Sequence, residues 1–188
     1  MVILISGASC VGKTNMAQKL LEKYRIPYLS IDHIKMGLFR SGNDYGFSPE
    51  SEDEIITQKL WPIIKGILLT NIENNQNIII EGCYLPENIN ELEENYLSKI
   101  IYFNIIFSEN YIKENIYKNI YEKRNIIEKR QYFIENKDTL INEYINDNKK
   151  YKEKCIKNNI NYFEIKNDYE LEMEKIYNWI DNEIMNMN

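Results

Sequence analysis

Apolar residues in this chain fall into short continuous runs, separated by longer segments in which they recur every three or four positions. The short runs are typical of strands buried on both faces of a parallel sheet, and the longer segments are typical of amphipathic helices. The expected strands are residues 2–5, 28–31, 78–80, 99–104 and 161–165. Because helical segments lie between them, the pattern predicts an α/β fold, a three-layer sandwich with right-handed crossovers.

The helical segments of the first half carry signals of where they begin and bend. We expect a second helix at about residues 33–40, followed by a loop at residues 41–49 that is rich in turn formers. Ser51 and Glu54 match a capping box ahead of a long helix, and Pro62 within that helix predicts a kink. The apolar face of the long helix is expected at Ile55, Ile56, Leu60, Ile63, Ile64, Ile67 and Leu68.

In the second half, a short helix is expected around residues 87–96, and Ser108 is a candidate N-cap. Residues 109–158 are helical in pattern, with an interruption expected between residues 125 and 138. A closing helix is expected from residue 169 to about residue 185. Its inward positions are predicted to be Leu171, Ile176, Trp179 and Ile180.

The length of 188 residues and the 44% content of hydrophobic residues suit a single globular domain with a sizeable core. The chain has 29 Asp and Glu against 23 Lys and Arg, and its net charge of −6 argues against general binding to nucleic acid or anionic membranes. Three cysteines, Cys10, Cys83 and Cys155, lie far apart and predict neither a disulfide framework nor a zinc site. We expect no signal peptide and no bilayer-spanning run, and therefore a cytoplasmic protein.

Residues 7–14, reading Gly-Ala-Ser-Cys-Val-Gly-Lys-Thr, match the P-loop pattern G-x-x-x-x-G-K-[ST] between a predicted strand and a predicted helix. The glycines allow backbone N–H groups to turn toward one phosphate, and the N-terminus of the next helix completes an anion site. Lys13 is placed to reach the β- and γ-phosphates, and the Thr14 hydroxyl to ligate Mg²⁺. A turn that binds nothing is the alternative. The predicted nucleotide-binding residues are Gly7, Ala8, Ser9, Cys10, Val11, Gly12, Lys13 and Thr14.

Besides the P-loop, the chain has Asp32 at the end of the second strand, Glu81-Gly82 at the end of the third and arginines beyond the fourth. Taken together, these features resemble the small P-loop kinases. That family includes nucleoside monophosphate, gluconate and shikimate kinases, chloramphenicol phosphotransferase, zeta-type toxins and 2-phosphoglycerate kinase. The resemblance implies a P-loop NTPase fold with a five-stranded parallel sheet in the order 2-3-1-4-5 and a helical lid at about residues 118–137. It also implies one kinase domain over residues 1–188, with an acceptor-site segment at about residues 33–75.

Two acids are candidates for the chemistry. Residues 30–36, Ser-Ile-Asp-His-Ile-Lys-Met, resemble family members that phosphorylate a hydroxyl, in which the matching aspartate accepts the hydroxyl proton. Asp32, one strand from the phosphate loop, could likewise orient or deprotonate an acceptor, and capping of the next helix is its alternative role. Glu81 could hold Mg²⁺ through water, and its alternative is a hydrogen bond with a P-loop N–H or with Thr14.

Arg124 and Arg130 are candidates for stabilising charge on the transferring phosphoryl group, because a guanidinium fork matches phosphate geometry. Six positions apart, they reach the same phosphate only if the helix is interrupted between them. Exposed surface positions are the alternative for both. Arg40 could bind an anionic group of the acceptor, and an ordinary cation at a helix terminus is its alternative.

The sequence therefore predicts an ATP- and Mg²⁺-dependent kinase that moves the γ-phosphate to a hydroxyl of a small soluble molecule. The predicted catalytic residues are Lys13, Asp32, Arg124 and Arg130, the substrate contacts are Asp32, Arg40 and Glu81, and the metal ligands are Thr14 and Glu81. A nucleoside or nucleotide kinase is one alternative, and a nucleotide-binding regulator or toxin-like protein with little turnover is another. A monomer or homodimer fits this prediction, while the acceptor and the choice of ATP over GTP stay open.

Overall fold

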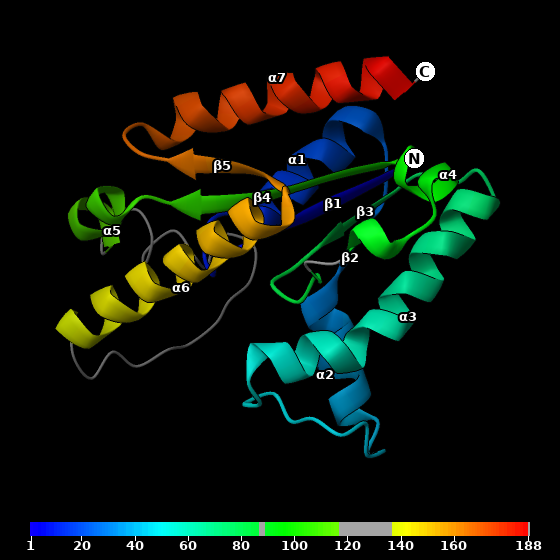
Figure 1. Cartoon of the computed structure of the whole chain (residues 1–188), viewed down its shortest axis with the longest axis horizontal. Helices are drawn as coiled ribbons and strands as arrows, with labels where there is room; N and C mark the ends of the chain where they lie inside the picture. Colours follow the sequence, from blue (N-terminus) through cyan, green and yellow to red (C-terminus); the bar gives the residue numbers. More distant parts are fainter. Residues whose placement is uncertain (87–88, 117–136, 188) are drawn as a thin grey trace.

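The computed structural model describes residues 1–86, 89–116 and 137–187. At its centre is a parallel sheet of β1 (Val2–Gly7), β2 (Tyr28–Ser30), β3 (Ile78–Glu81), β4 (Ile100–Phe107) and β5 (Asn161–Ile165). The strands lie in the order β2-β3-β1-β4-β5 (Figure 1). The predicted five-stranded parallel sheet and its order are therefore confirmed.

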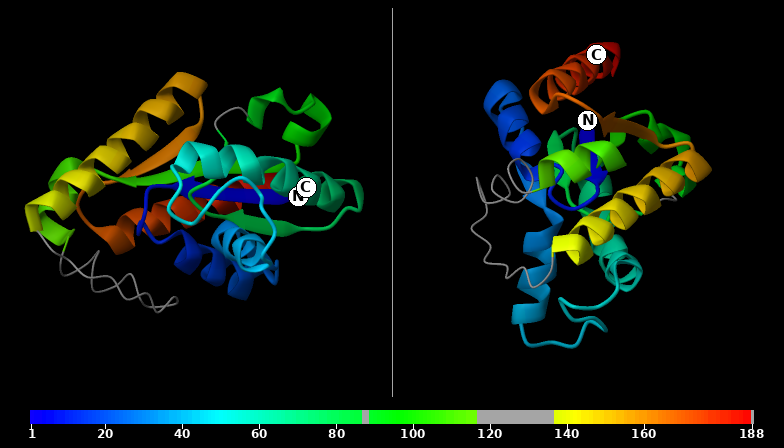
Figure 2. Two further views of the ribbon diagram at one scale, coloured as in Figure 1. Left: turned by 90° about the horizontal axis from the view of Figure 1, so that it is seen from below. Right: turned by 90° about the vertical axis from the view of Figure 1, so that its left-hand side faces the viewer.

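Helices cover both faces of this sheet. They are α1 (Lys13–Tyr24), α2 (Ile31–Arg40), α3 (Asp53–Glu73), α4 (Glu94–Leu97), α5 (Glu109–Asn115), α6 (Lys137–Asn158) and α7 (Tyr169–Met187), with a 3₁₀ turn η1 (Ile89–Glu91) before α4. α1 and α7 lie on one face, and α3 and α6 lie on the other (Figure 2). This is the predicted three-layer sandwich. None of the described helices combines the length and the apolar composition that crossing a bilayer requires.

β1 lies in the middle of the sheet, and all six of its residues are buried. Ile3 and Ile5 pack on the side of α1 and α7, whereas Val2 and Leu4 pack on the side of α3. Both faces of the strand are covered, which explains why its sequence is apolar without alternation. The loop that follows β1 therefore starts from a firmly held strand end.

The long helix α3 differs in two ways from its predicted start and apolar face. The capping box is wrong, because the helix begins at Asp53 and the Ser51 hydroxyl instead accepts a hydrogen bond from the N–H of Ser48 at 2.9 Å. Ile55 and Ile63 are 41% and 37% exposed, so the buried face is narrower than the apolar stripe. That face consists of Ile56, Leu60, Ile64, Leu68 and Ile72.

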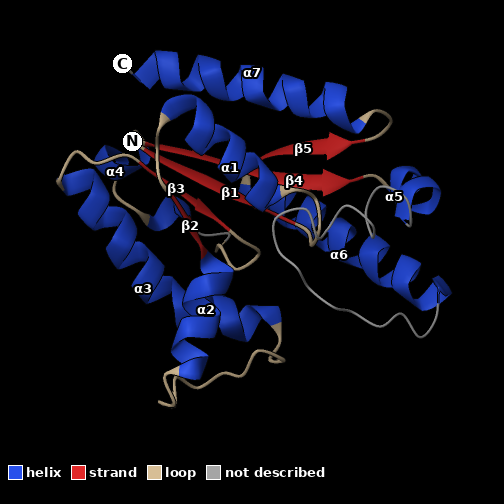
Figure 3. Cartoon of the chain, turned by 180° about the vertical axis from the view of Figure 1, so that it is seen from behind, coloured by secondary structure: helices blue, strands red, loops and turns tan. Residues whose placement is uncertain are grey.

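Pro62 lies inside α3, and the helix changes direction along its length (Figure 3). Proline removes one helical hydrogen bond and its ring crowds the preceding turn, so the kink at Pro62 stays a prediction. The first half of the helix leans toward α2 and the second half lies along the sheet (Figure 3). The bend brings the beginning of α3 beyond the carboxyl ends of the strands, where ligands bind in open parallel sheets.

The closing helix α7 also corrects a prediction. Leu171 is 59% exposed, and the inward position near the start of the helix is Met173, which is 2% exposed. Ile176 and Ile180 are buried as predicted, and Trp179 packs edge-to-face on Phe103 at a centroid distance of 5.4 Å. Tyr169 and Met173, two positions to either side of Leu171, pack on the core instead, so the apolar character of Leu171 alone did not decide its direction.

Candidate active site

The predicted phosphate loop joins β1 to α1, and its shape depends on a glycine at each end. Gly7 and Gly12 have φ angles of 131° and 96°, a range that side chains disfavour. A Cβ on Gly7 would lie 2.0 Å from the carbonyl oxygen of Ile105, and one on Gly12 would lie 2.0 Å from the hydroxyl of Tyr169. The loop is therefore pressed between β4 and α7, and neither position has room for a side chain.

Gly12 is also the N-cap of α1, so the amides of Lys13 and Thr14 lie in the first turn of that helix. The first N–H groups of a helix have no partner within it, and together with the helix dipole they favour an anion. The predicted nucleotide-binding residues thus form a strand, a tight loop and a helix start, which is the geometry that a P-loop requires.

The side chain of Lys13 lies over this loop and is 7% exposed. Its ammonium donates hydrogen bonds to the carbonyl oxygens of Gly7 at 3.0 Å and Ala8 at 2.7 Å. Burial alone would lower the pKa of Lys13, but the neighbouring Cys83 and Glu81 outweigh burial and raise it. Lys13 is therefore a fixed cation beside the helix N-terminus.

Glu81 ends β3 and is 2% exposed. It is in register with Ile5 of β1 and Ser30 of β2, and residues in register on parallel strands point to the same face. Ile5 packs on the α1 side, so Glu81 faces the layer whose first turn contains Thr14. The Ser30 hydroxyl on the same face is buried, with no hydrogen-bond partner among the described residues.

This donor set fits the predicted metal ion. Mg²⁺ takes oxygen ligands, keeps several of its waters and is usually held by one or two protein groups together with substrate phosphates. The Thr14 hydroxyl and the Glu81 carboxylate supply such groups, and a metal-bound water would give the buried Ser30 hydroxyl a partner. The described residues contain no cluster of three or more His, Cys, Asp or Glu side chains arranged to hold a metal ion by themselves.

Asp32 lies in the first turn of α2, because the structure ends β2 at Ser30 rather than at residue 31. Ser30 is the N-cap of α2, so Asp32 is not the capping residue. Its side chain is 21% exposed, and its Oδ1 forms an ion pair of 3.0 Å with Nζ of Lys35. Asp32 is thus a partly open carboxylate held by a cation on the next turn of the same helix.

Lys35 and Tyr84 complete a cluster that sequence reasoning missed. Lys35 is 8% exposed, and its ammonium donates a hydrogen bond of 2.7 Å to the Tyr84 hydroxyl. Burial would lower the pKa of Lys35, but Tyr84 and Asp32 together raise it. The only local signal was the spacing of Asp32 and Lys35, which allows an ion pair within one helical turn.

Helix α6 reaches the phosphate loop from the other side. The N–H of Ser9 donates to Oδ2 of Asp147 at 3.0 Å, and the Tyr144 hydroxyl donates to Sγ of Cys10 at 3.2 Å. The Tyr151 hydroxyl donates to the carbonyl oxygen of Cys83 at 2.6 Å. Three side chains of one helix thus contact both the phosphate loop and the segment after β3.

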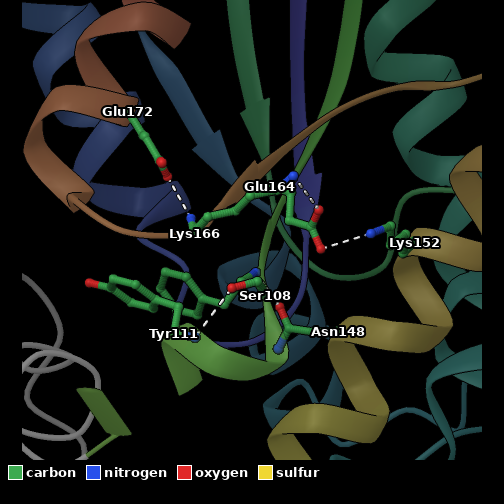
Figure 4. Close-up of polar contacts among 8 residues, drawn as sticks. Ser108, Tyr111, Asn148, Lys152, Glu164, Lys166 and Glu172 are labelled. Carbon is green, nitrogen blue, oxygen red and sulfur yellow. Dashed lines mark hydrogen bonds and ion pairs between the residues drawn. The ribbon is translucent and has the colours of Figure 1, made fainter. Parts of the chain in front are cut away.

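Asn148 and Lys152 attach α6 to the sheet. The side-chain oxygen of Asn148 accepts from the N–H of Phe107 at 2.6 Å, and Lys152 pairs with Glu164 of β5 at 2.8 Å (Figure 4). Ser108 accepts a hydrogen bond from the N–H of Tyr111 at 3.2 Å, which confirms it as the N-cap of α5 (Figure 4). These contacts fix the position from which Asp147 reaches the loop.

A cavity of about 740 Å³ lies between α3 and α6, at the face of the sheet opposite α1. Cys83 and Asp147 line it, and it therefore opens next to the phosphate loop. Burial raises the pKa of Cys83, the charge of Lys13 opposes this, and the charges of Asp32 and Asp147 add to it. Cys83 thus lies where the phosphate loop, the Asp32 cluster and the cavity meet.

The remaining predicted residues are not part of this cluster. Arg40 is exposed at the end of α2 and does not line the cavity. Arg124 and Arg130 lie outside the described residues, as does the predicted lid at about residues 118–137 apart from its last residue. The structure therefore brings Lys13, Glu81 and Asp32 to one edge of the sheet and leaves Arg40 apart from them.

Comparison with known proteins bears on the fold. No family model matches the sequence, and no curated protein matches it as a relative. Shikimate kinase from Bacteroides thetaiotaomicron is similar in structure, with a TM-score of 0.52, 13% identity and coverage of 96% of this chain and 98% of that one. A protein from Chloroflexus aurantiacus described as a candidate kinase has a TM-score of 0.52 and 14% identity, covering 100% of this chain and 97% of the other. The chain thus has the fold of the small P-loop kinases, as its sequence predicted.

Proposed function

We propose that this protein is an ATP- and Mg²⁺-dependent kinase that phosphorylates a hydroxyl of a small soluble molecule, in one domain spanning residues 1–188. The observation that supports this proposal is that Cys83 lies near two functional groups. The first group is the N-terminus of α1 with the fixed cation Lys13, and the second is the partly open carboxylate of Asp32. Phosphoryl transfer depends mainly on positioning and charge stabilisation, and these residues supply both.

The phosphate loop and Lys13 bind the β- and γ-phosphates in this proposal, and Thr14 and Glu81 hold the metal ion directly and through water. Mg²⁺, when bound, neutralises charge on the phosphates. Lys13 leaves the carbonyl oxygens of Gly7 and Ala8, which it contacts in this structure, and donates to phosphate oxygens instead. Arg124 and Arg130, which lie outside the described residues, are proposed to stabilise charge on the same phosphates.

Asp32 orients the acceptor hydroxyl and takes its proton. As the acceptor oxygen forms its bond to the γ-phosphorus, the bond from that phosphorus to the oxygen retained by ADP breaks, and the hydroxyl proton passes to the Asp32 carboxylate. Lys35 and Tyr84 act through Asp32, because their contacts fix the direction of its side chain. Both are positioning residues.

The test has two separate measurements on the full chain. The first is binding of a fluorescent ATP analogue with and without Mg²⁺, and we expect tight binding that Lys13→Ala weakens. The second is ADP release with a panel of hydroxyl compounds that includes nucleosides and nucleoside monophosphates. A nucleoside as the best acceptor would favour the nucleotide-kinase alternative, and nucleotide binding without any acceptor would favour the regulator or toxin-like alternative.

A further inference from the structure

The cavity between α3 and α6 carries more negative than positive charge. Its lining includes Glu52, Asp53 and Glu54 from the start of α3, Asp147 from α6, and the cations Lys150 and Lys154. Lys154 forms an ion pair of 3.3 Å with Glu54, which offsets that carboxylate. Asp53 remains on the α3 wall and Asp147 on the α6 wall, and Asp147 lies beside the phosphate loop.

These two carboxylates repel each other across the space. Burial raises the pKa of Asp53, the charges of Asp147 and Glu54 raise it further, and the charges of Lys35 and Lys154 only partly oppose this rise. A cation between them would remove this repulsion, since an opposite charge within a few ångströms favours the ionised carboxylate. Because Asp147 also accepts a hydrogen bond from Ser9, a cation held there lies beside the phosphate loop.

The floor of the cavity supplies an independent sign of a polar ligand. Asn104 of β4 lines the cavity and is 3% exposed, and within the described residues its carboxamide makes no hydrogen bond. Ser6, in register with it on β1, has a buried hydroxyl that also lacks a partner there. Because Asn104 faces the cavity, its carboxamide is available to hydrogen-bond to a polar ligand held there.

The walls favour an organic cation over a metal ion. Trp61, Tyr102 and Tyr151 line the cavity, and aromatic faces attract ammonium groups. The described residues form no metal-holding cluster, and the part of the lining that the structure describes contains no arginine. Guanidinium forks are the usual partners of carboxylates and phosphates, and this described part of the lining offers none to an anionic acceptor.

We propose that this cavity binds the phosphoryl acceptor and that the acceptor is an amino alcohol, such as an amino sugar. Asp53 and Asp147 hold its protonated amine, Asn104 bonds to its polar groups, and a hydroxyl faces the phosphate loop. This inference rests on the proposed kinase function. It adds the chemical class of the substrate, which the P-loop by itself leaves open.

The test uses compounds matched in size and hydroxyl content but different in charge. Glucosamine, glucose and glucuronate form one set, and ethanolamine, ethylene glycol and glycolate form a second. ADP release is measured for each with the full chain, Mg²⁺ and ATP. We expect at least one amine to give a kcat/KM at least tenfold above that of its neutral and acidic counterparts.

Variants locate the effect. Asp53→Asn should raise the KM of the preferred amine at least tenfold and change kcat less, and Asp53→Lys should shift the preference toward the acidic compound. Glu50→Gln, at an exposed position outside the cavity, is the matched control and should leave both constants within twofold. An unchanged amine KM in Asp53→Asn would overturn the assignment even if the amine is the best acceptor.

The outcomes separate the two proposals. If nucleotide binds and a neutral or acidic compound is the best acceptor, the kinase proposal stands and the amino-alcohol proposal is wrong. If nucleotide does not bind, or no compound of any charge accepts phosphate, both proposals are wrong.

Discussion

The proposed phosphate-binding end and the proposed acceptor end of this site, called below the phosphate end and the acceptor end, are built in different ways. The first comes from eight consecutive residues between a buried strand and a helix, and its shape is set by two glycines. The second combines α2, α3, the segment after β3 and α6, which are distant in the sequence. Ser9 and Asp147, which meet at the boundary, are 138 positions apart.

This difference separates what is general in the site from what is specific. Any nucleoside triphosphate presents the same phosphates, so a short local motif is enough to bind them. In our proposal the acceptor is recognised by side chains on several elements, whose positions depend on how the elements pack. We therefore expect changes at the phosphate end to abolish activity with every acceptor, and changes at the acceptor end to alter rate or preference.

The largest expected effect comes from Lys13→Ala, because Lys13 is the only fixed cation described over the phosphate loop. We expect kcat/KM for the nucleotide to fall by about 10³, the size found when one preorganised donor to a developing charge is removed. ADP release and fluorescent-nucleotide binding measure it. Lys19→Ala, exposed on the same helix, is the control and should stay within twofold. Activity within threefold of the unmodified protein would remove Lys13 from the mechanism.

At the acceptor end, Asp32→Asn keeps the shape of the side chain but removes its capacity to take a proton. We expect kcat to fall by about 10², a typical contribution of a general base, while nucleotide affinity stays within a few-fold. Single-turnover kinetics and nucleotide titration measure the two quantities separately. Equal losses in both would mean that Asp32 serves the nucleotide site, and no loss would remove its catalytic role.

The sequence predicted the strand, loop and helix of the phosphate end because the signals for them are local. The apolar run of β1, the glycines and Lys13 all lie within a few residues of one another, and the strand order follows from a resemblance that they support. The acid at the end of β3 was found for the same reason. Its orientation was not predicted, because it follows from the register of Glu81 with Ile5, which only the structure shows.

The acceptor end was predicted only in part, because its geometry is non-local. Nothing near Asp147 in the sequence indicates that α6 carries it to Ser9. The apolar stripe of α3 could not show that Ile56 and Ile64 are buried while Ile55 and Ile63 are exposed, since neighbouring apolar residues satisfy the same helical period. Tertiary packing makes that choice.

The boundary between the two ends depends on the attachment of α6, which Asn148→Ala tests. Asn148 is 3% exposed, its oxygen accepts from the N–H of Phe107, and its NH₂ group donates to the Tyr144 carbonyl oxygen at 2.8 Å. Leaving the buried N–H without a partner should lower the free energy of unfolding by about 1–3 kcal/mol. Urea denaturation measures it, with the exposed Asn146→Ala as control. A loss no greater than that of the control would show that α6 is held by other contacts.

The smallest expected effect is that of Lys35→Met, which sharpens the comparison within the acceptor end. The pKa of Lys35 is raised, so its ammonium stays protonated through the neutral range, and the pair with Asp32 is lost only as pH rises through that raised pKa. Removing the cation makes protonation of Asp32 easier, because an opposite charge nearby favours the ionised carboxylate.

We therefore expect Lys35→Met to lower kcat about tenfold at neutral pH and to move the acidic limb of the pH–rate profile to higher pH. Lys35→Arg keeps the positive charge and should restore the position of that limb, whereas Tyr84→Phe keeps the ion pair and should leave it in place. Measuring kcat from acidic to neutral pH distinguishes these variants. If the profiles of all three variants coincide, Lys35 supports the fold of α2 and does not position Asp32. The acceptor end then lacks Lys35 as a functional group.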